Sequence, residues 1–162
     1  MTRSPRYWLV KSEPTSFSID DLARAPRQTT AWDGVRNYQE RNFIREMAVG
    51  DRVLFYHSNA EPPAVVGSAE VVKAAYPDDT QFDRHNHHFD PASTRQQPRW
   101  DMVDLKFREK FHSAVPLDQL RQESQLKEMV LLRKGSRLSV QPVAEREWSI
   151  IVKLGRSKKG SR

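Results

Sequence analysis

Aromatic and polar residues occur together at the ends of several predicted strands and helices. The aromatic residues in these positions are Trp32, Tyr56 and Trp100. Hydrogen-bonding side chains accompany them at Ser12, Asn37, Ser58 and Ser139, and cations at Lys11, Arg36 and Arg137. Flat rings, hydrogen-bonding groups and cations are what a protein uses to stack an extruded nucleobase, read its edge and hold its phosphate. The pattern therefore favours a binding site for a nucleobase, in which stacking is worth about 1–3 kcal/mol per base.

Each of these residues also has a purely structural interpretation. A tryptophan is more often a core residue whose N–H finds one partner, as we expect for Trp8 and Trp148. Gly34 is also explained by a turn, and Arg36 by an ion pair with Glu40 one helical turn later. The functional hypothesis therefore rests on the set of residues and on their meeting in space.

Motifs for nucleotide or covalent chemistry do not occur in the sequence. The six glycines never form G-x-G-x-x-G or a Walker loop, and G-x-S-x-G is missing. The chain has no cysteine, which excludes disulfides, thiolate metal sites and cysteine nucleophiles.

A cluster of potential metal ligands lies in one irregular segment, at Asp83, His85, His87, His88 and Asp90. Imidazole and carboxylate groups suit zinc or iron, but metal ligands normally sit on well-supported elements. We therefore expect a solvated polar loop here, with no metal, and we expect no cofactor.

The net charge of +6 is unevenly distributed along the chain. Residues 1–60 carry nine Lys and Arg against seven Asp and Glu, and residues 61–155 carry fourteen of each. The last seven residues add four positive charges. Such a tail favours polyanions by releasing their counterions, and it serves equally well as a solubilising terminus. We expect one domain over residues 1–155 and a disordered basic tail over 156–162.

Length and hydropathy predict a single soluble domain. A chain of 162 residues with a mean hydropathy of −0.78 is long enough to bury a core. No apolar run approaches the ~20 residues of a membrane span, and the polar N-terminal residues contain no signal-peptide region. We therefore expect a cytoplasmic protein with no membrane partner, and we expect it to be a monomer.

Hydrophobic periodicity and turn residues predict an α+β fold. Strands are predicted over residues 7–11, 52–57, 64–74, 103–108 and 137–140, and Gly67 indicates a bulge or a close backbone approach within the third. Helices are predicted to begin at Ser18 and end at Pro26, and to cover 38–47, 117–132 and 144–152. Residues 76–98 are irregular, and hence either functional or mobile. This order lacks a βαβ rhythm and favours a curved, mostly antiparallel sheet or barrel flanked by short helices.

Several strings of the sequence resemble the EVE domain family. The longest are YWLVKSEP at 7–14 and WDGVRNYQ at 32–39, the second followed by RNF at 41–43. The match continues in order with GD at 50–51, FYHS at 55–58, VG at 66–67, YPD at 76–78, PRW at 98–100 and SRLSV at 136–140. The resemblance covers residues 7 to about 154, nearly the whole chain.

The resemblance implies a PUA-like fold, with a curved antiparallel sheet or pseudo-barrel, and binding of nucleic acid that carries a modified base, in particular a modified cytosine. The base would be flipped into a pocket, clamped by two of the three aromatic residues, with phosphates held by Arg36, Arg137 and Lys11. The pocket residues that it implies are Lys11, Ser12, Trp32, Val35, Arg36, Asn37, Tyr56, His57, Ser58, Trp100, Arg137 and Ser139.

Two other functions stay open on the sequence alone. A small hydrolase of modified nucleosides, as in ASCH-type relatives, would use Lys11, Glu13 and His57 as base and polariser. Lys11 would then have to be desolvated, because lysine normally titrates near 10.4. A protein-interaction domain without a ligand would instead show an exposed dry patch. The sequence does not distinguish DNA from RNA or one modification from another.

Overall fold

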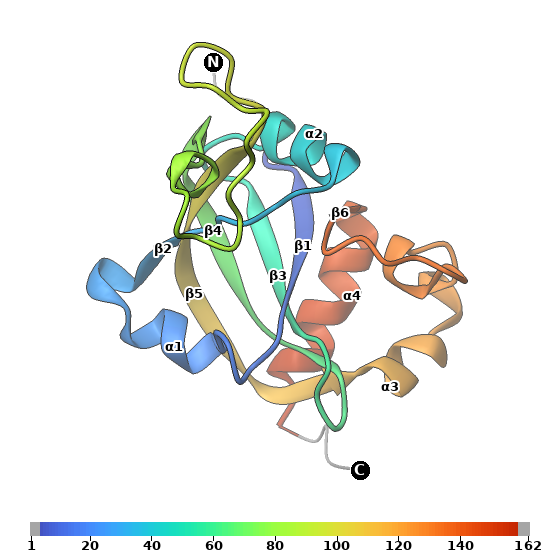
Figure 1. The fold of residues 1–162 in the computed structure, drawn as a ribbon. Coiled ribbons are helices and arrows are strands. Elements are labelled where there is room, and N and C mark those ends of the chain that lie inside the picture. Colours follow the sequence, from blue (N-terminus) through green and yellow to red (C-terminus); the bar gives the residue numbers. More distant parts are fainter. Residues whose placement is uncertain (1–3, 159–162) are drawn as a thin grey trace.

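One curved sheet of six strands organises the computed structural model, which describes residues 4–158 (Figure 1). The strands are β1 (Tyr7–Ser12), β2 (Thr29–Ala31), β3 (Arg52–His57), β4 (Ala64–Pro77), β5 (Asp101–Pro116) and β6 (Val140–Val143). Their order across the sheet is β2-β5-β4-β3-β1-β6. β1 and β3 run parallel and the other neighbours are antiparallel. The predicted α+β class and mostly antiparallel sheet are confirmed.

Four short helices flank this sheet in the described part of the chain. They are α1 (Ile19–Arg24), α2 (Tyr38–Glu46), α3 (Leu117–Arg121) and α4 (Glu145–Arg156). The predicted start of α1 is confirmed, because the Ser18 hydroxyl accepts a hydrogen bond from Asp21 N and the Asp21 carboxylate accepts one from Ser18 N. No described helix is long and apolar enough to cross a membrane.

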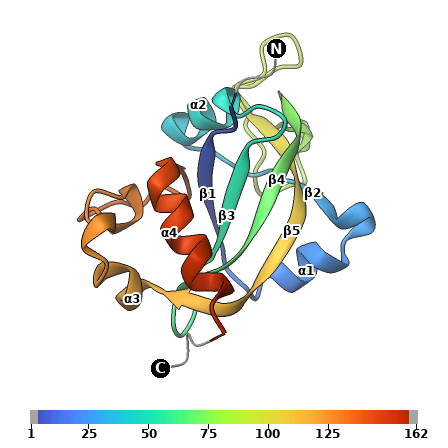
Figure 2. The same ribbon diagram turned by 180° about the vertical axis from the view of Figure 1, so that it is seen from behind.

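The sheet separates two hydrophobic cores because side chains alternate along its central strands. Trp8 and Val10 of β1 join the core formed with α1 and α2, whereas Leu9 joins the core formed with α3 and α4. β3 alternates in the same way, with Phe55 in the first core and Tyr56 in the second. Figure 2 shows α4 lying across the face of the sheet opposite to the one seen in Figure 1.

The predicted long helix over 117–132 is wrong. α3 ends at Arg121, where Gln122 N and Glu123 N donate to carbonyls only three residues earlier and so tighten the chain. Short 3₁₀ turns follow at Ser124–Leu126 and Val130–Leu132. The buried residues of this segment do not follow one helical face, because the chain turns to bring each of them into the core; they are Leu120, Leu126, Met129 and Leu131.

The remaining differences concern element ends. β4 and β5 extend beyond their predicted bounds and pair with several register shifts, one of them beside Gly67 as predicted. The last strand begins at Val140, so the predicted strand residues before it form the connection into β6. Arg156, expected in the tail, ends α4, and its Nη2 lies 2.7 Å from Glu109 Oε1. Residues 159–162 of the predicted tail lie outside the described residues.

We expect Gly67→Ala to destabilise the domain. A Cβ at this position would lie 2.4 Å from the Glu109 carbonyl oxygen, which is backbone and cannot move without disturbing the β4–β5 pairing. Overpacking of this kind costs about 1–3 kcal/mol. Urea denaturation measures the loss, with Ala74→Ser at an exposed position of β4 as the control. An unchanged midpoint for Gly67→Ala would contradict the close approach.

Candidate functional site

A cavity of about 390 Å³ opens where β1 ends and the segment after β2 passes it. Five of the predicted pocket residues line it: Lys11, Ser12, Trp32, Val35 and Ser139. They come from three distant parts of the sequence, and two backbone hydrogen bonds align those parts. Lys11 N donates to the Ser139 carbonyl, and Trp32 N donates to the Val103 carbonyl, which continues the pairing of β2 with β5.

Further lining residues were not among the predicted pocket residues. They include Glu13, Ser16, Phe17, Asp33, Gly34 and Glu40. Glu40 matters most among them, because it is a charged side chain that is only 8% exposed. The sequence placed Glu40 on the polar face of its helix, and nothing in the local pattern distinguishes a buried carboxylate from a solvated one.

Glu40 is held in the cavity by its helix and by the connection into β6. The Asn37 side chain caps α2 by accepting a hydrogen bond from Glu40 N at 2.9 Å. The Glu40 carboxylate accepts hydrogen bonds from Ser139 N at 2.7 Å and Ser139 Oγ at 2.9 Å. Each carboxylate oxygen has a second lone pair, so Glu40 retains capacity to accept from a ligand. Asn37, a predicted pocket residue, acts in this structure as the cap that places Glu40.

Lys11 supplies the matching positive charge. Its Nζ lies 5.9 Å from the centroid of the Tyr56 ring, on the neighbouring strand. Burial lowers the pKa of Lys11 from its ordinary value, and the negative charge of Glu40 opposes that shift. A cation and a carboxylate are thus both among the residues that line the cavity.

Trp32 is the tryptophan of the cavity. Its ring meets Phe17 edge-on at a centroid distance of 6.4 Å and Phe55 at 5.6 Å, so it is half-buried against the first core. Its indole N–H has no hydrogen bond to any residue in the range 4–158. Trp32 and Phe17 therefore form the aromatic lining.

Two of the three aromatic residues of the expected clamp lie outside the lining of this cavity. Tyr56 is only 4% exposed and belongs to the second core, because it alternates with Phe55 to the opposite face of β3. Trp100 is 5% exposed, donates its indole N–H to Asp90 Oδ2 at 2.7 Å and stacks on Tyr38. Neither ring lines the cavity.

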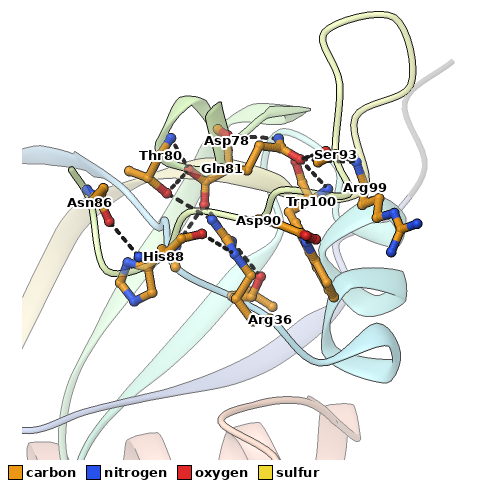
Figure 3. A network of polar contacts seen from close by, with 12 residues as sticks. Arg36, Asp78, Thr80, Gln81, Asn86, His88, Asp90, Ser93, Arg99 and Trp100 are labelled. Carbon is orange, nitrogen blue, oxygen red and sulfur yellow. Dashed lines mark hydrogen bonds and ion pairs between the residues drawn. The ribbon is translucent and has the colours of Figure 1, made fainter. Parts of the chain in front are cut away.

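Arg36 joins the rim of the cavity to the following loop (Figure 3). Its guanidinium donates to the Asp78 carboxylate at 3.1 Å, to the His88 carbonyl at 2.9 Å and to Thr80 Oγ1 at 3.0 Å. Asp78 also accepts a hydrogen bond from Gly34 N at 2.8 Å. Arg36 therefore neither pairs with Glu40, the structural alternative, nor lines the cavity, and its guanidinium is already engaged by Asp78.

Asp78 remains charged although it is completely buried. Burial by itself raises the pKa of a carboxyl, but the hydrogen bonds from Thr80, Gly34 and Arg36 outweigh that effect and lower the pKa of Asp78. The carboxylate can therefore hold both the cavity rim and the loop.

The predicted irregular stretch is held in place by one buried amide. The Gln81 Nε2 atom donates to the carbonyls of Asp78 and Trp100, both at 2.8 Å. Its Oε1 atom accepts hydrogen bonds from Ser93 Oγ, Arg99 N and Trp100 N (Figure 3). The cluster of potential metal ligands that the sequence contains lies in this loop, and no three potential ligands among residues 4–158 gather around one point.

The other predicted residues lie outside the cavity lining. His57 Nε2 accepts a hydrogen bond from Ile19 N at 3.1 Å, and burial lowers the pKa of His57. Ser58 N donates to the Ser12 carbonyl at 3.0 Å, and Arg137 is exposed. Of the residues considered for hydrolysis, Lys11 and Glu13 line the cavity, and Glu13 accepts a hydrogen bond from Asn59 Nδ2.

Comparison with known proteins relates this fold to one family. A family model described as the EVE domain matches residues 6–154. Human thymocyte nuclear protein 1 is 44% identical over 165 residues, which cover 91% of this chain and 73% of that protein. A crystal structure from Pseudomonas putida has a TM-score of 0.87 and 46% identity, covering 91% of this chain and 97% of its own.

A further similar structure is that of the human THYN1 protein in complex with DNA containing 5-methylcytosine. Its TM-score is 0.88 at 43% identity, covering 94% of this chain and 98% of that chain. The six-stranded, mostly antiparallel sheet and the similarity to these structures define a PUA-like domain. The chain belongs to the EVE domain family, as the sequence resemblance implied.

We expect the stability of the domain to fall as the pH drops below about 6.5, the ordinary pKa of histidine. Because burial lowers the pKa of His57, the unfolded chain binds the proton more readily than the folded one. The contribution of neutral His57 is therefore complete above that pH and is lost as the pH falls through the folded-state pKa. Urea denaturation at pH 7.5 and 5.5 measures the change.

The variant His57→Gln keeps an acceptor for Ile19 N but cannot be protonated, so its pH dependence should be smaller than that of the natural protein. The part that remains is expected from His88, whose pKa burial also lowers. An equal pH dependence in both proteins would show that His57 does not titrate as described.

We expect Glu40→Gln to lower the pKa of Lys11 further. The substitution preserves an acceptor for Ser139 but removes the charge that opposes the effect of burial on Lys11. Titration of the Lys11 side chain by NMR measures the shift. Glu46→Gln is the matched control on the same helix, because Glu46 is exposed and pairs with Arg6 instead. Equal Lys11 titration in both variants would contradict the Lys11–Glu40 interaction.

Proposed function

We propose that this domain binds nucleic acid carrying a modified base and that the base enters the cavity beside Trp32. The observation that carries the proposal is a cavity of about 390 Å³ that combines an indole with a cation and a buried carboxylate. Its volume falls within the roughly 300–1,000 Å³ of small-ligand sites. The complex of the human THYN1 protein with DNA containing 5-methylcytosine supports the same class of partner.

A base stacked inside a duplex cannot enter a cavity of the protein, so binding requires extrusion of the base at a cost of a few kcal/mol. Stacking on Trp32 offsets part of that cost, since the Trp32 ring lies at the cavity. The indole N–H, which is free within the described residues, is available as a donor to the ligand. Lys11 donates to acceptors on the base edge, and Glu40 accepts from an amino group. The Lys11–Glu40 pair thus selects a base that carries a donor beside an acceptor.

Cytosine fits this arrangement, because its N4 amino group is a donor and its N3 and O2 atoms are acceptors. A methyl group on the ring adds apolar surface, for which Phe17 and Val35 provide apolar lining. Burial of one such group is worth about 0.8 kcal/mol, or roughly a fourfold preference over unmodified cytosine. We therefore propose methylated cytosine in DNA as the preferred base.

We also propose that the domain acts by binding and not by catalysis. His57 is the best candidate base, but its Nε2 atom already accepts a hydrogen bond from a backbone N–H. Glu13 accepts a hydrogen bond from the Asn59 side chain. A general base must reach the proton that it removes. Release of an amine from N4-methylcytidine, or of an acid from an N4-acylcytidine, by the purified protein would overturn this proposal.

Trp32→Ala should abolish the preference for a modified base, because a base that no longer stacks on Trp32 is not held in the cavity where Phe17 and Val35 would contact its methyl group. Loss of the stacking platform costs about 1–3 kcal/mol, which corresponds to roughly 5- to 150-fold in affinity. Fluorescence anisotropy with matched oligonucleotides, modified and unmodified, as DNA and as RNA, at two salt concentrations, measures the effect. The control is Trp148→Ala, since Trp148 packs on Tyr7 at 5.1 Å as part of the second core.

The outcome is read from the ratio of the two affinities, because the folded fraction cancels in that ratio. Trp32 packs against Phe55, so urea denaturation accompanies the binding measurement to show that the variant is folded. A preference retained in Trp32→Ala, or lost equally in Trp148→Ala, would remove the cavity from the binding site.

A further inference from the structure

An exposed ring at the start of α2 holds two guanidinium groups. Tyr38 is 50% exposed, although it stacks on Trp100 at a centroid distance of 4.7 Å. The guanidinium carbon of Arg41, one turn further along the helix, lies 4.7 Å from the centre of the Tyr38 ring. The Arg99 Nη1 atom lies 3.4 Å from the Tyr38 hydroxyl oxygen. Below, we call Tyr38, Arg41 and Arg99 the Tyr38 surface.

The two arginines of this surface form no ion pair with any carboxylate among residues 4–158. Arg41 donates to the Asn42 side chain and to the Arg99 carbonyl. Nearby arginines differ, because Arg36 pairs with Asp78 and Arg45 pairs with Asp101. Arg99 is one of the charges that lower the pKa of Asp90, and the Asp90 carboxylate already accepts a hydrogen bond from the Trp100 indole.

The surface has the chemistry of a phosphate contact. A guanidinium presents forked donors that match phosphate oxygens, and one held in place loses less freedom on binding than a free side chain. The Tyr38 ring supports Arg41 and its hydroxyl contacts Arg99, so it positions both groups. Figure 3 shows the Arg99 side chain pointing away from the Gln81 network that holds its backbone.

The Tyr38 surface lies close to the cavity on the same helix. Glu40, which lines the cavity, belongs to the same turn of α2 as Tyr38 and Arg41. An α-helix is about 10 Å across with its side chains, so the two sites lie within reach of neighbouring nucleotides of one strand. We propose that Arg41 and Arg99 bind backbone phosphates of the strand whose base occupies the cavity, with Tyr38 as their positioning residue. This inference rests on the proposed function.

Binding to unmodified oligonucleotides tests this assignment separately from the cavity. Each phosphate contact contributes about 0.7–0.9 to the slope of log affinity against log salt concentration. Arg41→Gln and Arg99→Gln should each reduce that slope by about this amount. They should weaken modified and unmodified oligonucleotides equally, so that the ratio of the two affinities stays as in the natural protein.

Matched variants distinguish an effect of the lost charge from an effect on folding. Arg146→Gln, at an exposed position of α4, should leave both affinity and slope unchanged. Arg41→Lys and Arg99→Lys keep the charge and should retain most of the slope, which a merely structural role would not predict. Tyr38→Leu keeps both arginines but removes their support, so it should weaken affinity with little change in slope.

Two results would overturn the assignment. One is an unchanged salt slope in the folded double variant Arg41→Gln/Arg99→Gln, which would leave an acidic protein surface as the partner of this region. The other is loss of the modified-base preference alone, which would place the two arginines at the cavity. If instead the natural protein binds both oligonucleotides equally while the arginine variants still lose slope, the cavity proposal fails and the phosphate contact stands.

Discussion

The buried ion pair between Arg36 and Asp78 is the contact on which the site depends. Asp78 is fully buried, and it holds the backbone of Gly34 as well as the guanidinium. Arg36 in turn fixes the loop through Thr80 and the His88 carbonyl. Removal of one partner from such a pair typically costs about 3–5 kcal/mol, because a buried charge is left without compensation. The rim of the cavity therefore has a defined position only while this pair is intact.

Much of the fold was predictable because its signals are local. The alternation in β1 and β3, the Ser18 cap and the glycine beside the register shift follow from side-chain period and backbone sterics. The segment after α3 was not predictable, because a row of apolar residues at nearly helical spacing is also compatible with successive tight turns. The ordering of residues 78–100 depends on Gln81, whose partners are up to 19 residues away and leave no local pattern.

The candidate site was predictable in composition and only partly in geometry. Lys11, Ser12 and Trp32 meet as expected, because strand ends and the loops beside them gather at one edge of a sheet. Tyr56 and Trp100 have the right chemistry but lie elsewhere, since residue type does not specify the face of a strand or the interior of a loop. The role of Glu40 in the cavity could not be predicted, because the burial of its side chain depends on a distant segment that covers the start of α2.

The amide of Gln81 makes the loop sensitive to the exchange of a single atom. Its nitrogen donates hydrogen bonds to two backbone carbonyls, and its oxygen accepts hydrogen bonds from three donors. Deamidation, the slow hydrolytic ageing of amides, would replace the nitrogen by an oxygen that has no hydrogen to give. The carboxylate would then face two carbonyls in the interior. Chemical ageing at this one side chain would therefore loosen the whole connection between β4 and β5, without any change in the rest of the chain.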